Sequence, residues 1–166
     1  MNLSPAEHGA MRSISRLHIE NLLLEAKQSE RKRAILRLHE HHEPVQRMVN
    51  ALVPGTYVTP HKHENPDKVE LFSIVLGRIA VLHFNDLGDV TNIIVLEERG
   101  TERIVDIAPR TYHSLLPLEP SAALEIIQGP YDTATHKQFA PWAPQEGTPK
   151  AQDYMLHLQS IVHNWR

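Results

Sequence analysis

The sequence predicts a mainly β protein, built as a sandwich or a small barrel. Between residues 46 and 128, eight short runs rich in apolar and β-branched residues follow one another. Turn-forming residues such as Gly77 and Pro109 separate them, and an Asn85-to-Gly88 segment predicts a hairpin. Short strands at regular spacing with such turns are typical of closed or double-layered β folds. The expected strands are 46–53, 57–59, 68–76, 78–84, 90–96, 102–107, 113–118 and 122–128.

Helical patterns flank this β region. Ser15 is a suitable N-cap for a helix through about Gln28. The apolar stripe of that helix would consist of Leu17, Leu22, Leu23 and Ala26. A second short helical turn over 29–33 is expected next. Residues 34–39 could end that turn or begin the sheet, and we favour a strand.

The C-terminal part divides into an irregular tail and a helix. Prolines and aromatic residues between 129 and 147 argue against regular structure there and predict a segment packed down on the barrel. Thr148 followed by Pro149 then predicts a helix start. Side chains at helical spacing, expected to serve as core or subunit contact, are Tyr154, Met155, Leu158, Ile161, Val162 and Trp165.

Length favours one domain over the 166 residues. We divide it into a flexible lead-in over 1–13, a helical segment over 14–33, a barrel over 34–128, and the tail with its helix over 129–166. The chain contains no cysteine, which excludes disulfides and thiolate metal ligands. A net charge of −3 is not the excess of basic residues expected of a nucleic-acid-binding protein. No secretory signal and no membrane-spanning run is visible, so a cytoplasmic protein is expected.

The chemistry of the sequence centres on His61-Lys62-His63. In an extended segment, residues i and i+2 point to the same face, so both imidazoles can converge on one point. Glu70 follows inside an apolar run, where an unpaired buried charge would be costly. His113 comes at the end of a later strand pattern. Together these four residues predict a metal site with nitrogen and oxygen ligands.

Simpler interpretations stand beside this one. The three histidines could be hydrogen-bonded core residues, and Asp67 or Glu64 could replace Glu70 as the ligand. His39, His41 and His42 suggest metal binding, but a polar connection between elements is favoured.

Other polar residues leave their roles open. Arg47 would suit an anionic substrate, but it is equally well a surface residue. Strand parity does not decide whether Arg47 or the set Gln46, Met48 and Asn50 faces the interior. Tyr112 and Lys62 should face away from the site. A lid made by Tyr131, Lys137 and Trp142 is less favoured than structural packing.

The spacing of Gly55, His61, His63, Glu70 and Gly77 resembles the first motif of the cupin superfamily. Pro109 followed by His113 resembles the second. The interval from His63 to Glu70 is longer than in the cupin pattern, and the usual interval would select Asp67. Further segments resemble the WbuC-type cupin metalloproteins, some of which occur among polysaccharide (O-antigen) biosynthesis genes. These segments are 44–47, 68–72, 129–132 and 139–144.

The resemblance implies a cupin-type double-stranded β-helix (jelly roll) with an N-terminal helix and a short C-terminal helix. It implies one divalent ion per chain (zinc, iron, manganese or nickel) on His61, His63, Glu70 and His113. A small-molecule metalloenzyme acting on a sugar-derived or anionic ligand is expected, with isomerase, dioxygenase and lyase chemistry all open. A non-catalytic binding or sensing module and a metal-free epimerase-like cupin are the alternatives. Cupins commonly pair, so a homodimer is expected.

Overall fold

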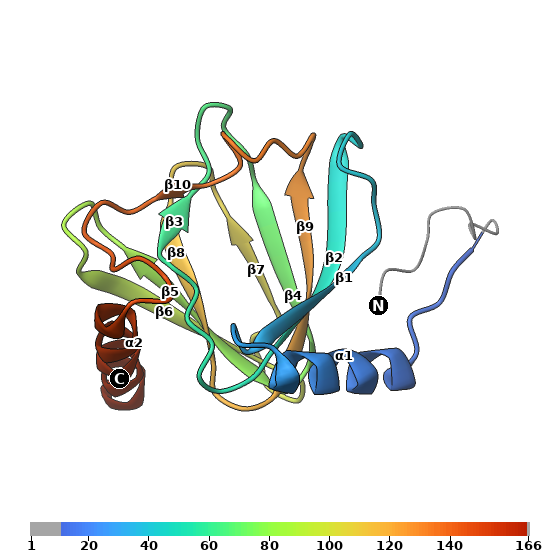
Figure 1. Ribbon diagram of the computed structural model, residues 1–166, viewed down its shortest axis with the longest axis horizontal. Helices are drawn as coiled ribbons and strands as arrows, with labels where there is room; N and C mark the ends of the chain where they lie inside the picture. Colours follow the sequence, from blue (N-terminus) through green and yellow to red (C-terminus); the bar gives the residue numbers. More distant parts are fainter. Residues whose placement is uncertain (1–10, 166) are drawn as a thin grey trace.

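A computed structural model describes residues 11–165 of the chain. Two five-stranded sheets face each other, with α1 below one sheet and α2 outside the other (Figure 1). The strand orders are β1-β2-β9-β4-β7 and β10-β3-β8-β5-β6, and the paired strands are antiparallel. The elements are α1 Arg16–Gln28, β1 Arg33–Arg37, β2 Val45–Leu52, β3 His61–Lys62, β4 Glu70–Leu76, β5 Arg78–Phe84, β6 Val90–Glu97, β7 Ile104–Ile107, β8 Tyr112–Pro117, β9 Ser121–Gln128, β10 Gln138–Phe139 and α2 Pro149–Asn164.

Seven of the eight predicted strands are present, the strand at 78–84 with its predicted ends and the other six with ends shifted by one or two residues, and the favoured strand near 34–39 is β1. The strand predicted at 57–59 is wrong, because that segment is irregular. The helical turn predicted at 29–33 is also wrong, since a turn ends at Lys32 with a left-handed φ of 57° and β1 begins directly after it. Of the predicted lead-in, residues 1–10 lie outside the described residues.

The two-residue strands β3 and β10 were not predicted. They pair with each other, with Phe139 opposite His61. Such short strands carry no period-2 pattern of their own, so they form only where a neighbouring edge is available. The prediction that residues 129–147 contain no regular structure is therefore wrong at β10.

Helix α1 begins as predicted, with the Ser15 side chain accepting a hydrogen bond from the backbone N–H of His18. Its buried side chains are Ile19, Leu22, Leu23 and Ala26. Leu17 is 64% exposed, so its place in the predicted stripe is wrong, and Ile19 completes the helical spacing instead. This face packs on the outer side of the first sheet, against residues such as Val49 and Ala122.

Helix α2 starts at Pro149 with Thr148 as its N-cap, as predicted. Ala151, Met155 and Leu158 are its buried residues, and the other predicted stripe residues Tyr154, Ile161 and Val162 are partly buried against them. Trp165 is the C-cap and is 41% exposed, so its place in the predicted stripe is wrong. The buried face covers the outer side of the second sheet, where it meets Leu82 and other residues of β5. No helix among residues 11–165 is long and apolar enough to cross a membrane.

The tail before α2 is packed down, as predicted. Trp142 lies against Phe84 and Tyr112 with ring centroids 5.3 and 5.8 Å away. Farther along, Glu146 accepts hydrogen bonds from Arg31 and Arg33. Trp142 is thereby a packing residue on the outer side of the second sheet rather than part of a lid.

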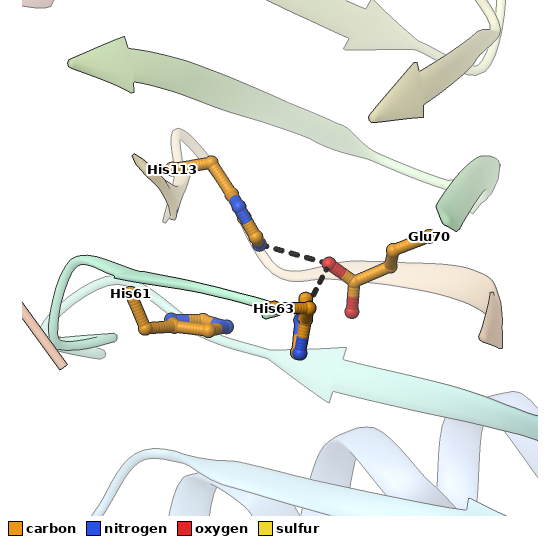
Figure 2. A group of neighbouring side chains, drawn as sticks. All are labelled: His61, His63, Glu70 and His113. Carbon is orange, nitrogen blue, oxygen red and sulfur yellow. Dashed lines mark ion pairs between the residues drawn. The ribbon is translucent and has the colours of Figure 1, made fainter. Parts of the chain in front are cut away.

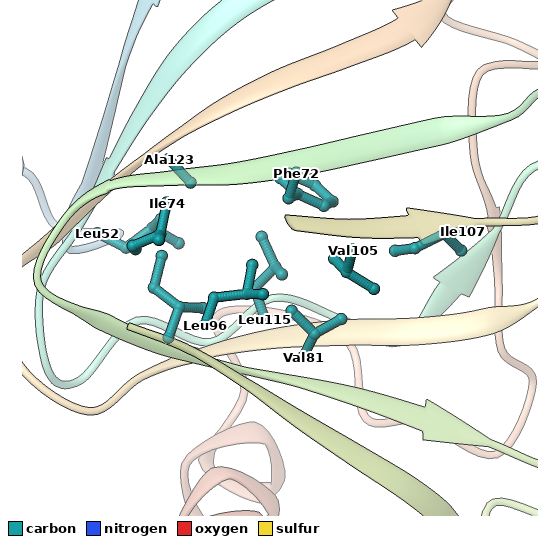
Figure 3. Packing of buried hydrophobic residues seen from close by; sticks show 10 residues of the cluster. Leu52, Phe72, Ile74, Val81, Leu96, Val105, Ile107, Leu115 and Ala123 are labelled. Carbon is teal, nitrogen blue, oxygen red and sulfur yellow. The ribbon is translucent and has the colours of Figure 1, made fainter. Parts of the chain in front are cut away.

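The space between the sheets is apolar at one end (Figure 3). Phe72 and Ile74 of β4, Val81 of β5 and Leu115 of β8 alternate into it with period 2. Two residues before Phe72 on β4, the next inward residue is Glu70. Two residues before Leu115 on β8, it is His113. Polar chemistry therefore occupies the other end of the same interior.

Gly77 makes the passage from β4 in one sheet to β5 in the other. Its φ is 79°, and an added Cβ would lie 2.5 Å from the backbone oxygen of Pro120. Only glycine fits this junction without displacing backbone.

Candidate metal centre

Four side chains predicted as ligands converge between the sheets: His61, His63, Glu70 and His113 (Figure 2). Each offers one ligand atom, and these atoms all lie within 4.8 Å of one another. The residues are only 2–3% exposed. The sequence prediction is correct in bringing these four together.

Strand pairing explains the convergence. His61 lies directly opposite His113 in the β3–β8 ladder, and His63 follows two residues after His61. Glu70 comes from the other sheet, where it opens β4 between Ile107 of β7 and Ile127 of β9. The three imidazoles and the carboxylate therefore approach from opposite walls.

Hydrogen bonds fix how each imidazole is presented. The Nδ1 atoms of His61, His63 and His113 lie 2.9, 2.6 and 2.9 Å from the backbone oxygens of Thr59, His136 and Thr111, respectively. A carbonyl only accepts, so each Nδ1 carries the proton. In the neutral rings, Nε2 is then an unprotonated acceptor. No hydrogen-bond donor in residues 11–165 satisfies these three Nε2 atoms or Glu70 Oε2.

These acceptors crowd one another. Glu70 Oε2 lies 2.8 Å from His113 Nε2 and 3.3 Å from His63 Nε2. Burial, and next the charge of Lys137, lower the pKa of His61 well below 6.5, which keeps that ring neutral. Burial acts to raise the pKa of Glu70, but the charge and hydrogen bonds of His113 and His63, when these rings are protonated, outweigh it, and the net pKa is then well below 4.5. A positive charge beside Glu70 thus keeps it a carboxylate.

The donor set fits a metal ion. Three buried nitrogens and one carboxylate oxygen with facing lone pairs repel one another unless a cation lies among them. Imidazole with carboxylate suits zinc, iron, manganese or nickel. Backbone acceptors on the far ring nitrogens are the arrangement usually found behind metal-binding histidines. The cluster could hold one divalent ion.

Neither alternative carboxylate joins the cluster. Glu64 pairs with Lys62, at 3.1 Å, and Asp67 pairs with Arg110, at 2.9 Å. The longer interval between His63 and Glu70 forms a loop, and Asp67 lies on its solvent side.

The other histidines singled out in the sequence lie elsewhere. His39 is buried, but its Nδ1 contacts the backbone of Arg47. His41 and His42 are exposed, in the connection before β2. The polar-connection interpretation agrees with this arrangement. Gln46 holds the same connection by donating to the backbone oxygen of Glu43 and two other carbonyls.

The orientation of β2, which sequence parity left open, is settled by burial. Gln46 and Asn50 are buried, whereas the Arg47 side chain is 44% exposed and bonds Glu43. Arg47 is thus a surface residue and does not meet a ligand in the interior. Tyr112 and Lys62 face away from the cluster, as predicted, with the Lys62 ammonium 4.8 Å from the centre of the Tyr112 ring.

Two residues near the site were missed. Glu125 of β9 is 8% exposed and accepts a 2.6 Å hydrogen bond from Asn50. Burial and then the charge of Glu70 raise its pKa to about 8. Its signal, an acidic residue inside an apolar strand, was the same one that identified Glu70.

His136 is the second missed residue. Its backbone oxygen orients His63, and its ring lies 5.3 Å from the His63 ring, centroid to centroid. Burial, and next Lys137, lower its pKa to about 3. It lies in the irregular tail, where no periodic pattern marks it.

A family model described as "Domain of unknown function (DUF6016)" matches residues 14–96. No curated protein matches the chain. Among solved structures, an uncharacterized conserved protein with a double-stranded β-helix domain from Klebsiella pneumoniae has a TM-score of 0.56 at 14% identity, covering 78% of this chain and 97% of that one. The capsular polysaccharide assembling protein CapF from Staphylococcus aureus has a TM-score of 0.53 at 21% identity, covering 67% of this chain. This chain spans 30% of CapF.

A cupin superfamily protein from Desulfitobacterium hafniense is also similar, with a TM-score of 0.48 and 15% identity over 60% of this chain and 80% of that one. At such identities the likenesses concern the fold. The Klebsiella protein and the two antiparallel sheets confirm the double-stranded β-helix that the cupin resemblance predicts.

Proposed function

The chain belongs to the family described as "Domain of unknown function (DUF6016)", and we propose that it is a metal-dependent enzyme acting on a small molecule. One observation carries this proposal. Three unprotonated Nε2 atoms and one carboxylate oxygen are buried together with no donor in the described chain to satisfy them. A fold gains nothing from such a cluster unless a cation completes it.

His61, His63, Glu70 and His113 would hold the ion. A divalent metal bound by three neutral imidazoles and one carboxylate retains a net positive charge and supplies Lewis-acid chemistry. Backbone carbonyls behind the imidazoles accept from Nδ1 and direct each Nε2 into the cluster before any ion binds. Zinc, iron, manganese and nickel all fit this donor set.

We further propose a sugar-derived substrate and a relationship to the WbuC-type cupins. This rests on the resemblance of four segments of the sequence to that group. CapF is described as a capsular polysaccharide assembling protein, and its likeness to this chain is one of fold.

A second function is favoured by one distance. His113 Nε2 and Glu70 Oε2 are 2.8 Å apart, which is a good hydrogen-bond length if a proton lies between them. In that state the pair is an acid–base dyad, and the protein would be a metal-free epimerase-like cupin. The two functions differ in what neutralises the same pair.

We also propose a homodimer. Exposed apolar side chains, Val75 of β4 and Ile104 of β7, lie on the outer face of the first sheet, since Ile74 and Val105 next to them point inward. Light scattering coupled to gel filtration tests this directly, and a monomeric mass would contradict it.

Elemental analysis tests the main proposal. The protein is purified without a metal-affinity tag, as wild type and as Glu70→Ala, His113→Ala and the exposed control His42→Ala. We expect near-stoichiometric metal in the wild type and in His42→Ala, and its loss in the other two. No metal in the wild type, and none taken up on addition, would reject the metal centre in favour of the dyad.

A further inference from the structure

Two side chains without an assigned role flank the cluster on opposite sides. The first is His83 of β5. It lies directly opposite His113 in the β5–β8 ladder, so its Cβ is on the same face of the sheet. It also follows Val81, which points into the interior, by two residues. Unlike His61 and His113, His83 is exposed, so it lies at the open end of the barrel.

The tautomer of His83 follows from Thr91. The Thr91 hydroxyl lies 3.3 Å from the backbone oxygen of His83 and 3.1 Å from its Nδ1. The hydroxyl has one proton, and the carbonyl can only accept it. When the hydroxyl donates to that carbonyl, Nδ1 donates to the hydroxyl oxygen, which leaves Nε2 as a free acceptor. His83 therefore offers a hydrogen-bond acceptor to a ligand at the open end.

The second side chain is Lys137, which immediately precedes β10. Phe139, two residues later, lies opposite His61, and its ring is 6.3 Å from the His61 ring. In an extended segment Lys137 lies on the same side as Phe139. Lys137 is half-buried.

The charge of Lys137 acts on residues of both walls. Burial is the largest cause of the low pKa of His61 on β3, and the charge of Lys137 is the next. The same charge partly offsets the raised pKa of Glu125 on β9. The backbone of Lys137 lies beside β3, since β10, which it precedes, pairs with β3. It forms no hydrogen bond or ion pair with another residue of the described chain, whereas Lys62, Lys68 and Arg110 each have a partner.

The two groups define a recognition pattern. A cation stands beside His61, and an acceptor stands beyond His113. Lys137 lies next to β10, and the backbones of β10 and β5 are three strand spacings apart in the order β10-β3-β8-β5, about 14 Å. The Lys137 and His83 side chains cover part of this distance from either end, so a ligand that fills the remainder is a small molecule of a few carbons. It needs an anionic group for Lys137 and a hydroxyl that donates to His83.

We propose that the site binds a small hydroxycarboxylate, with Lys137 attracting its carboxylate and His83 Nε2 accepting a hydrogen bond from its hydroxyl. This deepens the proposed function, since the same ligand would lie against the metal centre. Both residues bind ligand from outside the set of metal ligands. Their removal therefore leaves the metal content unchanged.

Titration calorimetry with three probes tests the pattern: D-glycerate, propionate without hydroxyls, and glycerol without a carboxylate. Each protein is first loaded with zinc and its zinc content measured, so a failure of the metal centre is seen before any probe is added. The variants are Lys137→Met and His83→Phe. Lys150→Met, on the exposed start of α2, is the matched control.

In the wild type we expect glycerate to bind about fivefold more tightly than propionate, since one hydrogen bond contributes about 1 kcal/mol, and glycerol to bind more weakly than either. Lys137→Met should weaken both carboxylates about tenfold. His83→Phe should remove the preference for glycerate over propionate and leave propionate binding unchanged.

Equal affinities in Lys137→Met and Lys150→Met would overturn the role of Lys137. An unchanged preference for glycerate in His83→Phe would overturn that of His83. Both titrations are repeated on metal-free protein, where the same ratios between variants are expected at lower affinity. The inference can therefore fail while zinc binding succeeds, and the reverse.

Discussion

His113 Nε2 and Glu70 Oε2 face each other at 2.8 Å in the interior of the barrel, and each carries a lone pair. The proton of the His113 ring is on the far side, at Nδ1, where it is donated to Thr111. Such a contact is favourable only with a cation or an added proton between the two atoms. The function of the protein depends on which of the two is present.

Replacing Glu70 with glutamine distinguishes these cases. The amide of Glu70→Gln can donate to His113 Nε2, so the lone-pair conflict disappears. In metal-free protein we expect the free energy of unfolding to rise by about 1 kcal/mol, together with loss of metal binding. Urea denaturation of both proteins in chelator measures this. A less stable metal-free variant would instead show that a proton bridges the wild-type pair.

Asp67 and Glu64 are expected to be dispensable for metal binding. Each is held by a basic neighbour, Arg110 and Lys62 respectively. Asp67→Ala and Glu64→Ala should retain wild-type metal stoichiometry in elemental analysis. Loss of metal from Asp67→Ala would mean that the loop before β4 rearranges around the ion and that Asp67 replaces Glu70.

Metal affinity should fall on acidification. Protons compete for the ring nitrogens below about pH 6.5, the ordinary imidazole pKa. Because burial and Lys137 lower the pKa of His61, that ligand resists protonation, and loss of metal should be gradual below pH 6.5. Competition with a metal indicator between pH 7.5 and 5.5 measures this. A constant affinity across this range would count against histidine ligands.

His136 predicts an acid sensitivity of the metal-free fold. Its pKa is about 3 in the folded protein and about 6.5 when unfolded. Below pH 6.5 the unfolded chain binds the proton and the folded chain does not, so stability falls as pH falls. The expected loss is roughly 1 kcal/mol per pH unit. His136→Leu keeps the backbone oxygen that orients His63 and should show a shallower slope.

The control for that slope is His42→Leu, at an exposed position. Stability curves from pH 7 to 5 are compared with wild type. Equal slopes in His136→Leu and wild type would show that His136 is not kept neutral by burial.

Glu125 predicts the opposite trend at higher pH. Its folded pKa of about 8 exceeds the unfolded value of about 4.5, so the folded chain holds a proton that the unfolded chain has released. Stability of the metal-free protein should therefore decline as pH rises from 4.5 to 8. Because Glu70 is next to it, the pair is best described as sharing one proton.

Glutamine at position 125 mimics the protonated acid. In the wild type this decline should be roughly 1 kcal/mol per pH unit, and Glu125→Gln should remove it. At pH 8 the variant should therefore be more stable than the wild type. Denaturant unfolding of metal-free protein at pH 6 and pH 8 measures it. A variant with the wild-type decline would show that another group releases the proton.

Local patterns revealed most of the elements and the four clustered residues. Ser15 and Thr148 begin helices because their side chains satisfy the first free N–H groups, a property of adjacent residues. His61 and His63 share a face because of the period of an extended chain. Glu70 was conspicuous as a charge in an apolar strand, and Glu125 could have been found by the same reasoning. Leu17 was misplaced because two registers of a short helix are nearly equivalent until a partner surface selects one.

What the sequence by itself determined was therefore local: strand and helix positions, capping, and residue types suited to a metal. Only the tertiary structure decided which side chains meet. The β3–β8–β5 register aligns His61, His113 and His83, and the pairing of β10 with β3 brings Lys137 beside them. It also turned Arg47 outward and Asn50 inward. The physical reason is that periodicity is a property of neighbouring residues, whereas register between distant strands is selected by packing of the whole core.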